Sequence, residues 1–183
     1  MRIPLLFALS LFAVNSCARV DDGKHVMAAV LEHFSKRTDT SSLEDDGLIV
    51  IRPATGTLPD GSFSGLAPMD DQPRCEADQK LYDRFVERNR KEGAAAELFD
   101  SGERWRVATS AELNHMPLLV STSDGKRLKT VMTLYAPAIS SDGRQAFVLL
   151  AFSWSIHGAR AGYVLDKIED EWRVRCSLLN FYV

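Results

Sequence analysis

The three cysteines of this chain, Cys17, Cys75 and Cys176, are the residues whose chemistry depends most on their surroundings. The sequence Val-Asn-Ser-Cys that ends at Cys17 resembles a bacterial lipobox, in which the cysteine becomes lipidated after cleavage. Asn15 departs from the small residue usual at its position. Two alternatives stay open: ordinary signal peptidase cleavage after Ala18, and a buried N-terminal helix that is never removed.

The residues before Cys17 have the composition of an export signal. Arg2 supplies one positive charge, and residues 3–14 form an apolar stretch interrupted by Pro4 and Ser10. A helix that crosses a bilayer needs about 20 apolar residues, so this stretch is too short and favours a cleaved signal. We therefore expect a signal peptide at 1–17 and one domain at 18–183. Lipidation would attach the domain to a membrane in the periplasm or at the outer membrane; ordinary cleavage would leave it secreted and soluble.

Export changes the interpretation of the other two cysteines. If Cys17 carries lipid, Cys75 and Cys176 form an even pair in an oxidising compartment, which predicts a disulfide. The closed loop would hold about 100 residues, for which the chain-entropy account gives at most roughly 4–5 kcal/mol. A redox role is the alternative, but no Cys-x-x-Cys spacing is present.

Other residue types with catalytic or binding potential do not form a recognised motif. His157 lies at a strand end beside a glycine-containing loop, and with Trp154 and Tyr163 it could line a pocket. The alternative is a polar strand end next to core aromatic residues. Ser123-x-x-Lys126 has the spacing of some acylating enzymes but lacks their partner motifs. The remaining histidines show no metal-ligand spacing, so we expect no metal, no cofactor and no catalytic set.

Composition limits the class of protein. The chain has 183 residues with 45% hydrophobic and 26% charged residues, which predicts one globular domain with a substantial core. The formal net charge is −3, and no basic face is visible, so nucleic acid is not an expected partner.

The N-terminal half predicts helices separated by loops. Helical spacing of apolar residues predicts a helix over 23–36, capped by Asp21 or Asp22, and a second over 75–91 that Cys75 opens. Residues 53–74 are rich in Pro, Gly, Ser and Asp and predict a long irregular loop. Short elements are expected at 48–51 and 105–107 as strands, at 94–99 as a helical turn, and at 110–115 as a helix with the capping box Thr109-x-x-Glu112.

The C-terminal half predicts a meander of strands over 129–138, 145–156, 163–168 and 172–181. A turn is expected at 140–143 and a loop at 158–162. Apolar residues on both sides of the first half of 145–156 predict a central strand covered on both faces for half its length. In the last strand, alternation places Trp172, Val174, Cys176 and Leu178 on one face. The fold class is α+β: a single domain with two main helices packed on a C-terminal antiparallel sheet, which a Cys75–Cys176 bridge would staple to a helix.

The segment from Ile139 to Leu149, the glycine-containing stretch 158–162 and the ending Trp172-Arg173-Val174 resemble a pattern found in uncharacterised exported bacterial proteins. The resemblance covers roughly residues 75–180, including Asn89 and the segment 110–113, and implies a fold but no function. The strand–turn–Trp ending is also similar to the tail of nuclear-transport-factor-like cone-shaped domains.

These observations favour a non-enzymatic envelope protein that binds another protein, with an immunity or inhibitor lipoprotein as one subclass. The alternative is a small-ligand-binding or enzymatic cone-shaped domain with an apolar cavity between sheet and helices.

Overall fold

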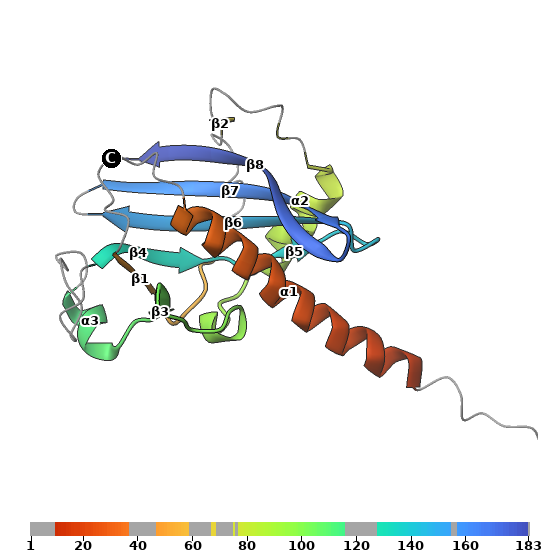
Figure 1. The fold of residues 1–183 in the computed structure, drawn as a ribbon, viewed down its shortest axis with the longest axis horizontal. Helices are drawn as coiled ribbons and strands as arrows, with labels where there is room; N and C mark the ends of the chain where they lie inside the picture. The colour runs from red at the N-terminus through yellow and green to blue at the C-terminus, as the bar shows by residue number, and fades with distance from the viewer. Residues whose placement is uncertain are drawn as a thin grey trace, which may run out of the picture.

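The computed structural model describes residues 10–36, 47–58, 67–68, 75, 77–115, 128–154 and 157–182. Their arrangement is an α+β domain built on one mixed sheet (Figure 1). The strand order is β2-β8-β7-β6-β4-β1-β3, with β5 paired to β6. The strands are β1 (Leu48–Ile51), β2 (Ala67–Pro68), β3 (Trp105–Val107), β4 (Leu128–Leu134), β5 (Ala138–Ile139), β6 (Gln145–Trp154), β7 (His157–Ile168) and β8 (Glu171–Tyr182).

The sequence-predicted C-terminal antiparallel sheet is confirmed. β4, β6, β7 and β8 pair in antiparallel fashion. β1 then extends this sheet in parallel to β4, and β3 lies parallel to β1, so the complete sheet is mixed. The expected strand at 129–138 is divided into β4 and the short β5, which pairs with Phe147 and Ala146 at the start of β6.

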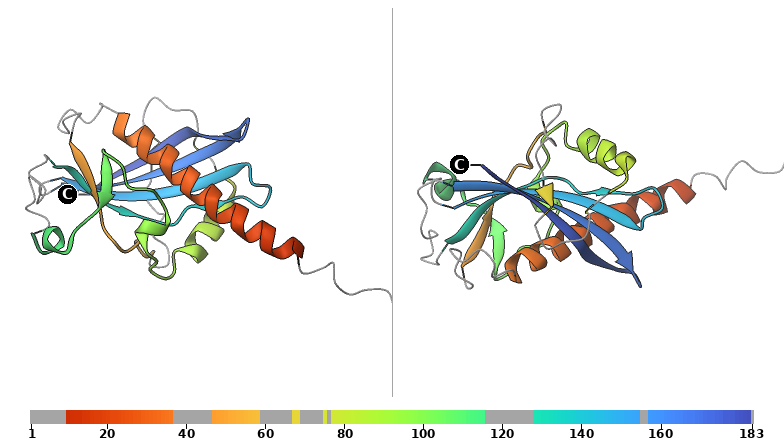
Figure 2. Two further views of the ribbon diagram at one scale, coloured as in Figure 1. Left: turned by 60° about the horizontal axis from the view of Figure 1, so that its bottom comes forward. Right: turned by 90° about the horizontal axis from the view of Figure 1, so that it is seen from above.

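The two main helices cover opposite faces of the sheet (Figure 2). Helix α1 (Ser10–Lys36) packs with a buried cluster that includes Val148, Leu150 and Phe152 of β6. Helix α2 (Gln79–Arg88) packs with Phe147 and Leu149, which alternate with the first set. The apolar pattern on both sides of β6 therefore predicted correctly that both of its faces are covered.

Both helices differ from their predicted bounds. Helix α1 begins at Ser10 rather than near residue 23, and no glycine or proline interrupts it between Ser10 and Asp22. Helix α2 begins at Gln79 and not at Cys75, because Asp78 occupies the N-cap and its carboxylate accepts from Lys80 N. Among the described residues, no helix is long and apolar enough to cross a membrane.

The loop predicted at 158–162 is wrong. Gly158 to Gly162 lie inside β7 and pair with β6 on one side and β8 on the other. Ala159 and Ala161 are buried in the cluster that α1 covers. Small residues usually weaken a strand, but here two neighbouring strands supply the backbone partners, so tertiary pairing overrides the local preference.

The predicted face of the last strand is also wrong, because β8 contains a bulge at Arg175. Val164 pairs with Cys176 and Leu165 pairs with Val174, which leaves Arg175 as the extra residue. Trp172 and Val174 consequently belong to the α1 side, whereas Cys176 and Leu178 belong to the α2 side.

The shorter elements follow their predictions. A 3-10 helix spans Ala95–Glu97, and helix α3 (Ser110–His115) follows β3. Within the expected irregular loop 53–74, Ala67 and Pro68 pair with the edge of β8 at Leu179 and Leu178, a position that tolerates proline. Most of 59–74 lies outside the described residues.

Candidate functional site

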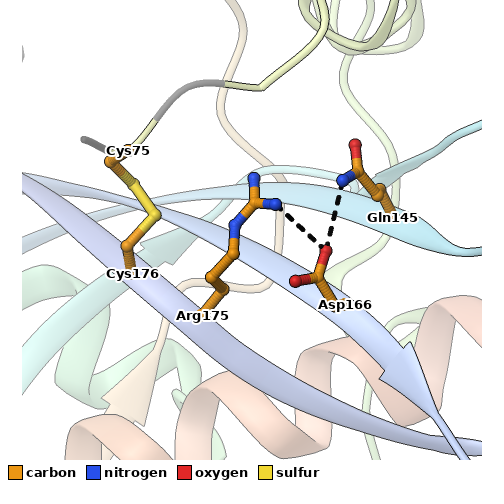
Figure 3. Close-up of a disulfide and its surroundings, with 5 residues drawn as sticks. All are labelled: Cys75, Gln145, Asp166, Arg175 and Cys176. Carbon is orange, nitrogen blue, oxygen red and sulfur yellow. Dashed lines mark hydrogen bonds and ion pairs between the residues drawn. A yellow bond between two sulfur atoms is a disulfide. The ribbon is translucent and has the colours of Figure 1, made fainter. Parts of the chain in front are cut away.

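Cys75 and Cys176 are joined by a disulfide, as the sequence predicts (Figure 3). Their Cα atoms are 5.6 Å apart, and 101 positions separate them in the chain. Both are buried within the cluster that α2 covers. The bridge ties the segment before α2 to β8 next to the bulge, so it links a helix layer to the sheet.

Three polar side chains lie together beside this bridge on the α2 side of the sheet (Figure 3). Gln145 Nε2 donates to Asp166 Oδ1 at 3.2 Å, and Arg175 Nη1 lies 3.4 Å from the same oxygen. The bulge presents Arg175 on this side, next to Cys176. Arg173 pairs directly with Asp166 across the strands and forms an ion pair with Glu171 at 3.1 Å.

The half-buried Tyr82 of α2 completes this surface, and burial raises the pKa of its phenol above the ordinary value. The positive charge of Arg175 acts on the same phenol and opposes that shift. We call the set Tyr82, Asp166, Arg173 and Arg175 the arginine patch. Sequence reasoning missed it, because alternation along β8 alone does not reveal a bulge.

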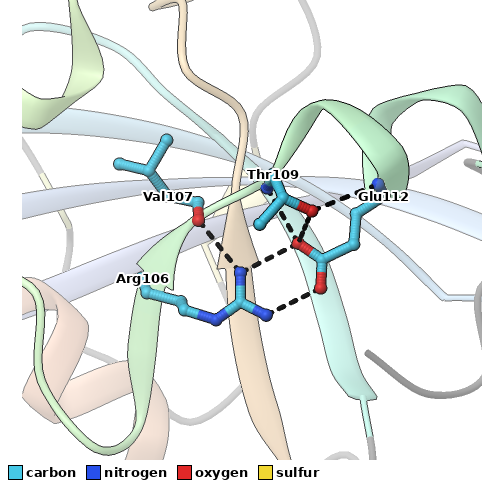
Figure 4. A network of polar contacts seen from close by, with 4 residues as sticks. All are labelled: Arg106, Val107, Thr109 and Glu112. Carbon is cyan, nitrogen blue, oxygen red and sulfur yellow. Dashed lines mark hydrogen bonds and ion pairs between the residues drawn. The ribbon is translucent and has the colours of Figure 1, made fainter. Parts of the chain in front are cut away.

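A second polar network fixes α3 to β3 (Figure 4). The predicted capping box is confirmed: Thr109 N donates to Glu112 Oε2 at 2.8 Å, and Glu112 N donates to Thr109 Oγ1 at 3.3 Å. Arg106 adds a bidentate pair, with Nη1 and Nη2 donating to the two Glu112 oxygens at 2.8 and 2.7 Å. Glu112 is 2% exposed. This carboxylate is therefore committed to holding the β3–α3 connection.

Helix α1 is clamped to the domain at three consecutive residues. Asp22 accepts from Lys167 Nζ at 2.9 Å and from Trp172 Nε1 at 3.4 Å. Lys24 forms an ion pair with Asp100 at 2.9 Å. Gly23 between them is buried and lies close to Pro137, the nearest atom that a Cβ there would meet. Asp22, expected as a helix cap, instead ties the helix to the β7–β8 hairpin.

Cys17 lies in the same helix, five residues before this clamp. Its side chain is outside the described part of the structure, as are all side chains from Ser10 to Asp21. The predicted cleavage and lipidation at Cys17 therefore stay predictions.

The residues expected to line a pocket come from two strands, Trp154 from β6 and His157 and Tyr163 from β7. Trp154 and His157 pair with each other at the β6–β7 end of the sheet. Tyr163 is six residues further along, about 20 Å at strand spacing. Its ring is 2% exposed and stands edge-on to His33 of α1, with ring centroids 5.9 Å apart. The register thus separates Tyr163 from the other two residues.

The described residues pack into apolar clusters on both sides of the sheet. Among them, no group of three or more His, Cys, Asp or Glu side chains could hold a metal ion. The central strand β6 is filled on both sides by buried side chains. The arginine patch and the α1 clamp both join residues that are far apart in the sequence.

Comparison with protein-family models, with curated proteins and with solved structures finds no match to this chain.

Proposed function

We propose that this chain is an exported envelope protein, attached to a membrane by a lipid on Cys17, which acts by binding another protein. The Cys75–Cys176 bridge carries the proposal. A disulfide between two buried cysteines suits a protein of the periplasm or cell surface, where thiols are oxidised, and is rare in a reducing cytosol. The bridge uses the two cysteines that remain once Cys17 is lipidated.

A binding role is preferred over catalysis or small-ligand capture because of how the sheet is packed. α1 and α2 cover opposite faces, and large apolar side chains fill the space under each. A cone-shaped binding domain instead needs an apolar cavity with converging polar groups. The pocket alternative relies on Trp154, His157 and Tyr163, but Tyr163 lies about 20 Å along β7 from the paired residues Trp154 and His157.

The arginine patch is the surface that we assign to the protein partner. Tyrosine and arginine are among the residue types most enriched at energetically important contacts. Here the Tyr82 ring is partly buried against the sheet, the charge of Arg175 acts on its phenol, and Arg173 and Arg175 are both exposed. Arg175 is paired with Asp166 and Arg173 with Glu171, so this surface offers charges of both signs to a polar partner surface. An immunity or inhibitor protein that neutralises a periplasmic hydrolase is one role consistent with such a surface.

The attachment is tested by metabolic labelling with palmitate. Label on the wild-type chain that is lost in Cys17→Ser, but retained in the matched variant Cys75→Ser, would support the proposal. Label that persists in Cys17→Ser, or no label on the wild type, would overturn the lipid attachment.

The partner is tested by crosslinking in intact cells followed by capture of the wild-type chain. The variant R173E/R175E should lose a specifically crosslinked protein, whereas R88E/R90E, at exposed positions around the C-terminal end of α2, should retain it. Equal recovery with both variants would contradict the assignment of the arginine patch. Capture of no protein at all would contradict the binding role.

A further inference from the structure

The beginning of the packed part of α1 is held on several sides at once. Asp22 bonds to Lys167 and Trp172, which flank the β7–β8 turn. Lys24 bonds to Asp100, and Gly23 lies against the connection between β4 and β5. From Val26 onward the inner side of the helix is fully buried. Among the side chains that the structure describes, the contacts of α1 with the rest of the domain begin at Asp22.

The distance from this clamp to Cys17 is short. Five residues of helix span about 7.5 Å, and α1 is continuous through both positions. Even if these residues were fully extended, they would reach only about 17 Å. A lipid on Cys17 would consequently be joined to the folded domain without a flexible tether.

The clamp also identifies which end of the domain is closest to Cys17. The N-terminal part of α1 runs out past the β7–β8 and β5–β6 turns, while α3 and the end of β8 lie at the opposite end (Figures 1 and 2). The two turns are neighbours, because Lys167 N donates to Arg144 O at 2.8 Å. The twelve residues of β7 place the opposite end about 36 Å further along the strand.

We infer that the domain lies directly against a lipid bilayer, with the β5–β6 and β7–β8 turns as its membrane-facing end. The inference rests on the proposed lipid attachment at Cys17 and adds an orientation to it. The end that carries α3 points away from the bilayer. The arginine patch lies beside the sheet near the membrane-facing end, so its partner is reached at the membrane surface and not at a distance from it.

The charges at the membrane-facing end do not attract an anionic bilayer. The exposed residues of the β7–β8 turn include Glu169, Asp170 and Glu171. Carboxylates are repelled by anionic lipid headgroups, so the surface itself does not attract the bilayer. The orientation then depends on the lipid and the short connection, and the Cys17→Ser chain should not bind vesicles of phosphatidylethanolamine and phosphatidylglycerol.

A pair of matched fluorescent labels tests the orientation in the full acylated protein. Ser141→Cys in the β5–β6 turn and Ser110→Cys at the start of α3 are both exposed serines. Each variant would carry a single reactive thiol, since Cys75 and Cys176 are bridged and Cys17 is acylated. The labelled proteins are placed in phosphatidylethanolamine–phosphatidylglycerol vesicles that contain a headgroup-attached quencher.

We expect a Stern–Volmer constant several-fold larger at position 141 than at position 110. Replacing both Asp22 and Lys24 by alanine should reduce that difference, because it removes the clamp. Equal quenching at the two positions, or stronger quenching at position 110, in acylated and vesicle-bound protein would overturn the orientation alone. A wild-type chain that carries no acyl group would overturn the proposed attachment together with this inference.

Discussion

Replacing Asn89, the C-cap of α2, by alanine should destabilise the domain more than replacing any polar residue within α2. Asn89 follows the last turn of α2 and is 0% exposed. Its Oδ1 accepts from Ala136 N at 2.7 Å, and its Nδ2 donates to Ala136 O and to Phe85 O, each at 2.9 Å. One amide therefore joins α2 to the connection between β4 and β5.

The magnitude follows from the groups that lose a partner. Alanine would leave the N–H and the C=O of Ala136 without their side-chain bonds, and each unsatisfied group costs about 1–2 kcal/mol at a partly buried position. Phe85 O keeps the backbone N–H of Asn89 as a donor. The expected loss is about 2–4 kcal/mol, a large share of the roughly 5–15 kcal/mol typical of a domain.

Urea and thermal unfolding of the oxidised protein measure this loss. For a chain of this size, about 2–4 kcal/mol lowers the Tm by roughly 5–15 °C. Gln79→Ala is the matched control, since Gln79 is exposed and bonds only to Asp83 in the described structure. Asn89→Asp should also be destabilised, because a carboxylate would face two carbonyl oxygens, and it should recover partly when acid protonates it. A loss below about 1 kcal/mol in Asn89→Ala would refute the reasoning.

Three further predictions concern the bridge, a close contact and a turn. Cys75→Ser should lower the free energy of unfolding by up to about 4–5 kcal/mol, measured in urea, and mass spectrometry that finds both thiols free in the wild type would contradict the bridge. Gly56→Ala should cost about 1–3 kcal/mol, because its Cβ would clash with the Tyr135 ring. Gly93→Ala, whose Cβ would lie 3.6 Å from Thr55 Oγ1, should be nearly neutral in the same thermal assay. The Ser140 hydroxyl and the Arg144 backbone N–H both donate to Asp142 and hold the pKa of Asp142 below its ordinary value. The contribution of Asp142 to stability is therefore present above its unfolded-state pKa and is lost as the pH falls through the lower folded-state pKa. An NMR titration in which Ser140→Ala leaves the Asp142 pKa unchanged would contradict this cause.

Much of the fold could be predicted from local patterns. The apolar residues on both sides of β6 indicated a strand covered on two faces, and α1 and α2 supply those two covers. The capping box at Thr109 and Glu112 was visible because its two residues act on each other across one turn. The disulfide followed from counting cysteines once Cys17 was assigned to the lipobox.

The errors arose where partners distant in sequence decide the structure. The bulge at Arg175 exists only in the pairing between β7 and β8, so alternation along β8 assigned Trp172 and Cys176 to the same face. The glycines and alanines of 158–162 looked like a loop because their strand character comes from two neighbouring strands. Asp22 looked like a helix cap because its partners Lys167 and Trp172 are far along the chain.

The arginine patch could not be anticipated for the same reason. It combines a residue of α2 with residues of β7 and β8 that only the register and the bulge bring together. The pocket hypothesis at Trp154, His157 and Tyr163 had the opposite fault. The three residues are near each other in sequence, but Tyr163 lies about 20 Å along β7 from the paired residues Trp154 and His157.

The most direct test of the proposed function is the intact mass of the mature chain isolated from the cell envelope. The account predicts a protein that begins at Cys17, carries the added mass of acyl groups on that residue, and contains the Cys75–Cys176 bridge. A chain that begins at Arg19 without lipid, or one that still begins at Met1, would contradict it.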